Sequence, residues 1–217
     1  MEKLDLKTIK AAHKILNTFS YELQPVVRGY ANRTLYVNLA DNKIESRPVS
    51  QQMKDVFTGG RGFCLWLLWN GVKDTTKWDD PENEIVIAMG PVCGNTNYPG
   101  SGKSLVVSLS PMTGVPIDSN VGGYFGPFLK FAGYDFLELQ GKAEKDIIIF
   151  IDGREGLLRI VEVPHLLEPA EPVVDLVAAR MPDDVVVRRE LALALLQSGE
   201  KCSDVTVGDE GATLLLD

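Results

Sequence analysis

The sequence contains little cysteine and little histidine. Its 217 residues include three cysteines, Cys64, Cys93 and Cys202, and two histidines, His13 and His165. Cysteines that are odd in number and far apart form neither a disulfide framework nor a C-x-x-C metal or redox pair, and two isolated histidines do not suggest a metal cage. We therefore predict buried thiols and no metal ligand on this chain.

The chain also lacks an excess of positive charge and any long apolar run. It has 30 acidic and 22 basic residues and a net charge of −8, which disfavours binding to nucleic acid or to an anionic membrane surface. No stretch approaches the ~20 apolar residues of a membrane span, and the first residues, MEKLDLK, contain no apolar signal core. We expect a soluble, cytoplasmic protein that binds neither nucleic acid nor a membrane.

One motif resembles a nucleotide site but departs from it. The residues GSGKS at 100–104 match the end of a P-loop, G-x-x-x-x-G-K-[ST], yet the position five residues before Gly102 is Asn97 instead of glycine. A helix should follow the lysine, whereas 105–109 is a β-branched, apolar run typical of a strand. We predict a strand–turn–strand unit without nucleotide hydrolysis, which leaves the role of Lys103 open.

Hydrophobic periodicity gives a mixed pattern in which strands dominate the middle of the chain. It predicts helices at residues 4–23, about 50–57, 63–69, 172–181 and 183–196. It predicts strands at 84–89, 105–109, 204–207 and 212–216, and two hairpins formed by 34–39 with 44–49 and by 136–140 with 146–151.

Residues 114–133, GVPIDSNVGGYFGPFLKFAG, are unusually rich in glycine. Glycine is used where the backbone turns tightly or passes close to another group. The composition is compatible with a set of tight turns and equally with a surface that binds a ligand.

Five sequence blocks indicate a family. They are GYANRTLYVNLADNKIE (Gly29–Glu45), FTGGRGF (Phe57–Phe63), DPENEIVIAMGPVCG (Asp80–Gly94), SPMTGVPIDSNVGGYFGPFLKFAGYD (Ser110–Asp135) and LQGKAEK (Leu139–Lys145). In this order and spacing the chain resembles the N-terminal domain of the aldehyde:ferredoxin oxidoreductase family, the tungsten–pterin enzymes. The resemblance covers about residues 29–153.

The resemblance implies an α+β fold with two stacked, mainly antiparallel β-sheets and flanking helices. We expect an N-terminal helical extension at 1–25, the family's β domain at 26–153 and a divergent region at 154–217 that completes the same domain.

The resemblance also implies a base for a tungsten- or molybdenum-bis-pterin cofactor. In the family, the arginine of a Gly-Gly-Arg turn reaches toward the cofactor and a neighbouring iron–sulfur cluster, and an Asn-x-Gly-Gly turn contacts the pterins. The arginine's place is taken here by Lys103, and the second turn corresponds to Asn120, Gly122 and Gly123. A lysine and backbone N–H groups suit a pterin phosphate, although lysine lacks the planar, two-pronged donor of arginine.

Family enzymes are much longer, and their further domains carry the iron–sulfur cysteines, pterin motifs and acid/base residues. Three scattered cysteines do not supply the four ligands of a [4Fe-4S] cluster. We therefore predict no catalytic residue and no iron–sulfur cluster on this chain alone. The partners we expect are a catalytic partner chain or missing C-terminal domains carrying a [4Fe-4S] cluster, together with a ferredoxin-like electron carrier.

Three interpretations remain open from the sequence. The first is a fragment or subunit that supplies part of the cofactor cleft of an oxidoreductase. The second is a non-catalytic paralogue acting as scaffold, maturation factor or electron-transfer partner, suggested by Lys103, the helix at 4–23 and the divergence after Arg154. The third is a small-molecule-binding module or independent enzyme using the carboxylates Asp118, Asp135 and Glu138, although Asp118 fits a turn or cap and Glu138 the exposed side of a strand.

Overall fold

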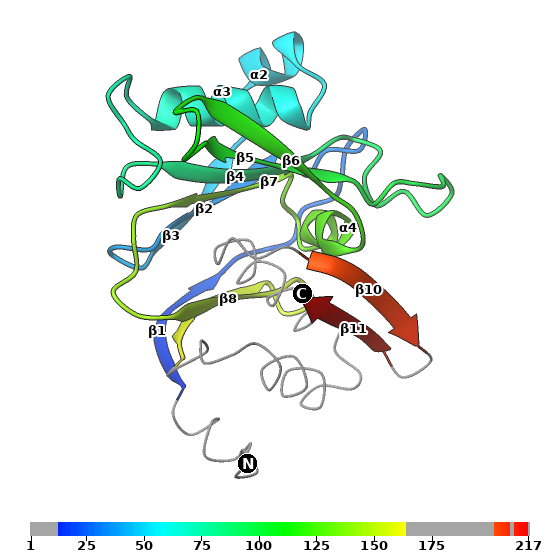
Figure 1. The fold of residues 1–217 in the computed structure, drawn as a ribbon. Helices are drawn as coiled ribbons and strands as arrows, with labels where there is room; N and C mark the ends of the chain where they lie inside the picture. The colour runs from blue at the N-terminus through cyan, green and yellow to red at the C-terminus, as the bar shows by residue number, and fades with distance from the viewer. Residues whose placement is uncertain (1–12, 164–201, 209–210, 217) are drawn as a thin grey trace. The chain divides into compact units, whose positions relative to one another are not determined.

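The computed structural model describes residues 13–163 and the backbone of 202–208 and 211–216. The chain divides into two compact units (Figure 1). One consists of Phe19–Glu144 and Gly153–Leu157, and the other of Lys145–Asp152 with the described parts of Met1–Thr18 and Leu158–Asp217.

The first unit is built on a six-stranded sheet with the order β3-β2-β7-β4-β5-β6 (Figure 1). Its strands are β2 (Arg33–Asn38), β3 (Lys43–Pro48), β4 (Glu84–Met89), β5 (Ser104–Leu109), β6 (Pro116–Val121) and β7 (Phe136–Gln140). Adjacent strands are antiparallel except β2 and β7, which run parallel. The expected α+β class with mainly antiparallel sheets is confirmed.

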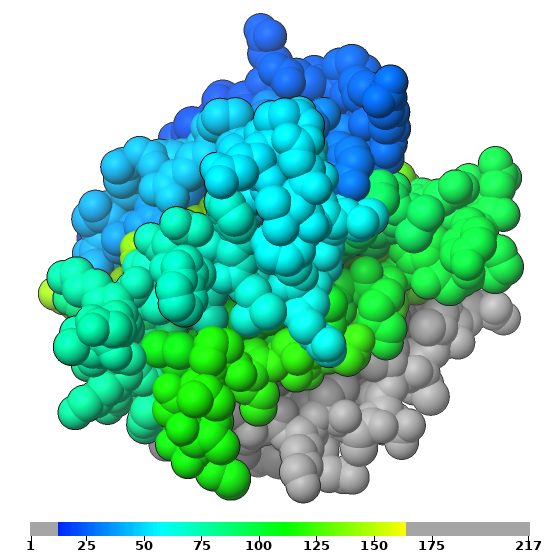
Figure 2. All heavy atoms as spheres, turned by 90° about the horizontal axis from the view of Figure 1, so that it is seen from above, coloured from blue at the N-terminus to red at the C-terminus, as the bar shows by residue number. Residues whose placement is uncertain are grey.

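Helices lie on both faces of this sheet. The helix α2 (Gln51–Val56) begins after Ser50, whose Oγ accepts a hydrogen bond from the Met53 N–H at 3.1 Å, as expected of an N-cap serine. It lies with α3 (Arg61–Gly71) on one face, and α4 (Phe125–Phe131) lies on the other (Figure 1). Seen from above in Figure 2, the cyan α2–α3 segment is not covered by any other described segment.

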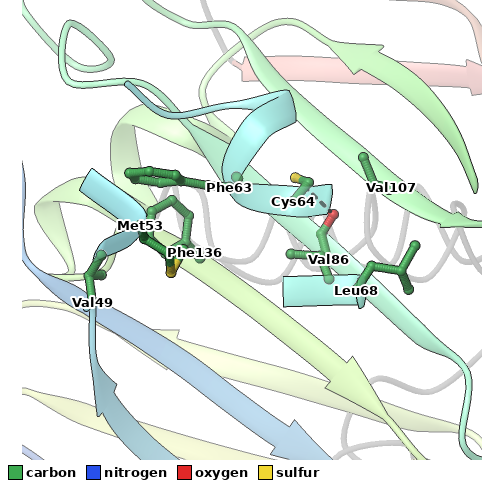
Figure 3. Close-up of a cluster of buried hydrophobic side chains, with 9 residues drawn as sticks. Val49, Met53, Phe63, Cys64, Leu68, Val86, Val107 and Phe136 are labelled. Carbon is green, nitrogen blue, oxygen red and sulfur yellow. Dashed lines mark hydrogen bonds between the residues drawn. The ribbon is translucent and has the colours of Figure 1, made fainter. Parts of the chain in front are cut away.

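The main core lies between α2, α3 and the sheet. Figure 3 shows Phe63, Cys64 and Leu68 of α3 directed toward side chains of the underlying strands. The rings of Phe63 and Phe136 meet edge to face, with centroids 4.8 Å apart, a favourable aromatic geometry. The buried members of this cluster are Val49, Met53, Phe63, Cys64, Leu68, Val86, Ala88, Val107 and Phe136.

A buried ion pair joins α4 to the start of β7. Lys130 and Asp135 contact each other directly, and both are almost inaccessible to solvent. The Asp135 carboxylate also accepts hydrogen bonds from the N–H groups of Ala31 at 3.0 Å and Asn32 at 2.6 Å, and the Lys130 ammonium donates to the Gly29 carbonyl at 2.8 Å. The pair therefore fixes the segment that leads into β2.

The second unit contains a three-stranded sheet, β1-β9-β8, and a hairpin. The bounds are β1 (Lys14–Ser20), β8 (Ile147–Asp152), β9 (Leu157–Glu162), β10 (Cys202–Gly208) and β11 (Gly211–Leu216). Leu158 and Ile160 on β9 are fully buried.

The helix expected at 4–23 is wrong over Lys14–Ser20, which form β1; residues 1–12 lie outside the described residues. Apolar residues in this segment fit helical spacing, but Ile15, Thr18 and Phe19 also favour extended backbone. The extended conformation is adopted because pairing with β9 gives the backbone N–H and C=O groups hydrogen-bond partners in a sheet.

The hairpin expected from 136–140 and 146–151 is also wrong. Both strands exist, as β7 and β8, but β7 pairs with β2 and β4 whereas β8 belongs to the other sheet. Local alternation identifies a strand without identifying its partner. The hairpin of β2 and β3 and the strands β4, β5, β10 and β11 are confirmed, and the helices expected at 172–181 and 183–196 lie outside the described residues.

Within the described part of the chain, no helix is long and apolar enough to span a membrane.

We expect Asp135→Ala to lower the free energy of unfolding by about 3–5 kcal/mol, because it leaves a buried ammonium without its counter-ion. Two backbone N–H groups also lose their acceptor. Urea unfolding followed by tryptophan fluorescence measures the change. The control is Asp74→Ala at an exposed position, for which we expect a change within about 0.5 kcal/mol; equal effects of the two substitutions would contradict the role of the pair.

Candidate functional site

The candidate site lies at one end of β5 and β6. The turn at 100–103 leads into β5, and β6 ends just before Gly122. Because the strands are antiparallel, with Ser104 opposite Val121 and Leu105 opposite Asn120, the two turns meet at the same end of the sheet. The structure thus brings together all four residues that the sequence proposed: Lys103, Asn120, Gly122 and Gly123.

The two turns touch through glycine backbones. A Cβ atom added to Gly102 would lie 2.4 Å from the Gly123 carbonyl oxygen, far inside van der Waals contact. Gly123 itself has φ of 82°, in the left-handed region that favours glycine. The close approach between the Lys103 turn and the Asn120 turn therefore requires glycine at 102, and the left-handed backbone favours glycine at 123.

A hollow of about 200 Å³ lies beside Lys103. It is bounded by the start of α3, the end of β4, the loop that follows β4 and the start of β5, and its lining residues are Gly60, Ala88, Met89, Gly90, Val92, Cys93, Gly100, Ser101, Lys103, Ser104 and Leu105. The Lys103 side chain is exposed and has no hydrogen-bond or ion-pair partner among the described residues. The hollow therefore combines a largely apolar floor with an available cation.

The residues present fit a flat ligand that carries phosphate. A Cβ atom at Gly100, Gly122 or Gly123 would meet no atom within 4 Å, so the backbone of both turns is accessible to a large group. Backbone N–H groups of glycine-rich turns and a lysine ammonium are donors from which phosphate oxygens accept hydrogen bonds. The arrangement can bind and orient such a ligand.

The cysteines of this region are not reactive groups. Burial raises the pKa of the Cys64 thiol to about 12 and that of the Cys93 thiol to about 11, so both are protonated near neutral pH. The expected buried thiols are confirmed for these two residues. Among the described residues, no three His, Cys, Asp or Glu side chains are placed to hold a metal ion.

The structure corrects two of the three carboxylates considered from the sequence. Asp118 lies within β6 instead of a turn or cap, and its carboxylate pairs with Arg61 at 2.7 Å. Glu138 is buried in β7 instead of exposed, because this central strand is covered on both faces: Leu137 and Leu139, which point to the opposite face, are buried as well. Asp135 serves the buried ion pair described above.

Arg61 is a residue that the sequence analysis missed. None of the six residues of β6 is buried, so side-chain packing does little to hold this edge strand. The Arg61 guanidinium reaches from the start of α3 to Asp118, two residues before Asn120. The sequence feature that could have identified Arg61 is the Gly59-Gly60-Arg61 turn directly before an apolar helix.

Comparison with known proteins identifies the family. Residues 34–188 match the family model described as "Aldehyde ferredoxin oxidoreductase, N-terminal domain". The chain belongs to this family. The turns around Lys103 and Asn120 are thus elements of an aldehyde ferredoxin oxidoreductase N-terminal domain.

Several relatives are much longer than this chain. The chain is 40% identical over 138 residues to a tungsten-containing aldehyde ferredoxin oxidoreductase of Pyrococcus furiosus, covering 64% of this chain and 22% of the relative. It is 35% identical over 127 residues to the "Aliphatic sulfonate oxidoreductase, WOR-like subunit" of the same organism, covering 56% and 20%. The chain thus spans about a fifth of the length of these relatives.

A solved structure shares the fold. The active site complex BamBC of benzoyl coenzyme A reductase, determined with 1,5-dienoyl-CoA, matches with a TM-score of 0.58 and 28% sequence identity. The match covers 62% of this chain and 20% of that chain.

We expect Gly102→Ala to lower the free energy of unfolding by about 1–3 kcal/mol, the usual cost of overpacking a tight contact. It should also increase amide hydrogen exchange at 120–123, because the added methyl group pushes the two turns apart. Gly90→Ala is the matched control, since its Cβ would meet no atom within 4 Å. Unchanged exchange at 120–123 in Gly102→Ala would show that the turns do not depend on this contact.

We expect a coupling of about 0.2–1 kcal/mol between Arg61→Ala and Asp118→Ala in a double-mutant cycle, as for other exposed ion pairs. High salt should reduce it, because the pair is screened by solvent ions. Urea unfolding at low and high salt measures the coupling, and strictly additive effects at low salt would show that Arg61 does not hold β6.

Proposed function

We propose that this chain supplies the cofactor-cradling surface of an aldehyde ferredoxin oxidoreductase-like enzyme, with further domains or a partner chain closing the site. The observation that carries the proposal is the glycine contact that joins the Lys103 turn to the Asn120 turn beside a hollow. Family membership supports it, since the chain matches the N-terminal domain model over most of its length.

The cofactor we propose is a tungsten- or molybdenum-bis-pterin. When bound, it would supply the redox chemistry of the enzyme, which protein side chains do not provide. Lys103 would neutralise a pterin phosphate, the open backbone at Gly122 and Gly123 would let the ring system lie close, and the exposed Asn120 amide would donate and accept hydrogen bonds.

The partners we propose are the catalytic chain or domains that carry a [4Fe-4S] cluster, and a ferredoxin-like electron carrier. Two similarities support a divided enzyme: one relative is named a subunit, and the BamBC structure is named an active site complex. The chain's own described residues would bind and orient the cofactor without performing acid/base chemistry on the substrate.

Anaerobic purification of the protein from its native source, followed by native mass spectrometry, tests the proposal. The same fractions are assayed for tungsten, molybdenum, iron and pterin fluorescence. A complex that contains metal and pterin is the expected result. A bare monomer or homodimer would instead favour a non-catalytic paralogue that retains the glycine-rich turns as inherited architecture.

In such a complex we expect Lys103→Ala to reduce pterin retention about 10- to 100-fold, because hydrogen bonds to charged groups contribute about 1.5–3 kcal/mol. Pterin fluorescence per mole of chain after gel filtration measures retention. Lys142→Ala, at an exposed lysine outside the hollow, is the matched control. Equal retention in the two variants would exclude Lys103 as a phosphate ligand.

A further inference from the structure

Two glutamates lie inside the six-stranded sheet, away from the candidate site. Glu84 begins β4 with 2% of its surface exposed, and Glu138 lies in β7 with 5% exposed. The strands are antiparallel neighbours in which Val86 is opposite Glu138. Glu84 is two residues from Val86, so both carboxyl groups lie on the same face of the sheet.

The end of α3 packs directly on Glu84. A Cβ atom at Gly71, the last residue of α3, would lie 2.1 Å from the Glu84 Oε2 atom. That oxygen has no hydrogen-bond partner among the described residues. The carbonyl end of a helix carries partial negative charge, and the last turn of α3 contains no basic residue. This environment opposes a charged carboxylate.

Among the described residues, only Arg47 forms an ion pair with either of the two glutamates, and it belongs to β3, which is separated from β7 by β2. Arg47 lies 3.5 Å from the Glu138 carboxylate and 2.8 Å from that of Glu45, and its guanidinium stacks over the Tyr36 ring at 3.4 Å. Glu45 also pairs with Lys43 at 2.6 Å. Arg47 is therefore shared between Glu45 and Glu138.

The other elements around Glu84 add no compensating charge. Among the described strands, β2 contributes Tyr36, whose hydroxyl donates to Gln140 at 2.7 Å. The residues of β5 and of the last turn of α3 are not titratable, and Glu82 in the preceding loop is exposed. Glu84 is left with a second carboxyl group beside it and no cation of its own.

We propose that Glu84 and Glu138 form a proton-binding site, in which the folded protein holds a proton at neutral pH and so keeps the end of α3 docked on β4. A protonated carboxyl group carries an O–H donor and no net charge, which suits a buried position against helix carbonyls. Because α3 begins beside Gly60 of the hollow, the same helix connects the proton site to the candidate cofactor site.

The direction of titration supports this assignment. Burial, followed by repulsion from Glu138, raises the pKa of Glu84 to about 8. Burial raises the pKa of Glu138 to about 7, with Arg47 acting in the opposite direction. Since the folded-state pKa values lie above the unfolded value, the stabilisation is complete at low pH and is lost as pH rises through about 8.

Carboxyl ¹³C NMR of the full chain tests the site directly. The glutamate side chains are titrated from about pH 5 to about pH 9.5, and the resonances are assigned with Glu84→Gln and Glu138→Gln. We expect a glutamate midpoint above about 6.5 that is absent in Glu84→Gln, whereas unperturbed glutamates titrate near 4.3. Midpoints below about 5.5 for every glutamate would overturn the proposal.

Urea unfolding between about pH 6 and pH 8 is the second test. Uptake of a proton by the folded state alone makes the folding equilibrium constant fall up to about tenfold per pH unit. Glu84→Gln should reduce this dependence, and the exposed control Glu144→Gln should retain it. A slope that remains unchanged when Glu84 and Glu138 are both replaced by glutamine would assign the proton to another group and overturn the proposal.

A bound cation is the competing explanation for two buried carboxylates. The NMR titration is therefore repeated with a chelator and with added Mg²⁺ or Ca²⁺. Midpoints that do not respond to the metals support proton binding. A fall of about one pH unit or more with either metal would identify a cation site instead, since a nearby positive charge favours the ionised carboxylate.

Discussion

The buried ion pair between Lys130 and Asp135 is the interaction on which the arrangement of the first unit depends. It joins α4 and the start of β7 to the segment before β2, which lies about a hundred residues earlier in the sequence. Burying two charges carries a large desolvation cost, so such a pair contributes little net stability but strongly penalises alternatives in which either charge lacks its partner. With β2 and β7 paired in parallel, the Ala31 and Asn32 N–H groups reach the Asp135 carboxylate.

The candidate site lies at the edge of the sheet, where the strands are least buried. The central strands β2, β7 and β4 are nearly all buried, whereas β6 at the edge has no buried residue. Segments with few buried contacts open most easily, so a site on an edge strand needs other means of positioning. The Gly102–Gly123 contact positions the backbone of this site, and the Arg61–Asp118 ion pair adds a side-chain contact that holds β6. Both act on the same short stretch, Asp118–Gly123, which carries the proposed cofactor turn.

Sequence patterns predicted the parts of the fold that local periodicity determines. The β2–β3 hairpin and the strands β4 and β5 follow from alternation and from apolar runs. The sequence did not predict which strands pair with each other. The segments of β7 and β8 resemble a hairpin in sequence, but in the fold they belong to different sheets. The exposed position expected for Glu138 failed for a related reason: alternation implies a solvent-facing side only when a strand is covered on one face. The four candidate residues were chosen by resemblance, and their proximity required the β5–β6 register to be seen.

Lys103 and Glu84 show how burial converts an unpaired charge into different chemistry. Each lacks a partner among the described residues at a key polar atom, the Lys103 ammonium and the Glu84 Oε2. The Lys103 ammonium is exposed to solvent and is therefore accessible to an anionic ligand. No water reaches the Glu84 carboxyl group, so ionisation is disfavoured and the smallest available cation, a proton, removes the charge. The difference in burial between the two residues therefore explains why the proposed cofactor site lies at the open edge of the sheet and the proposed proton site lies at its centre.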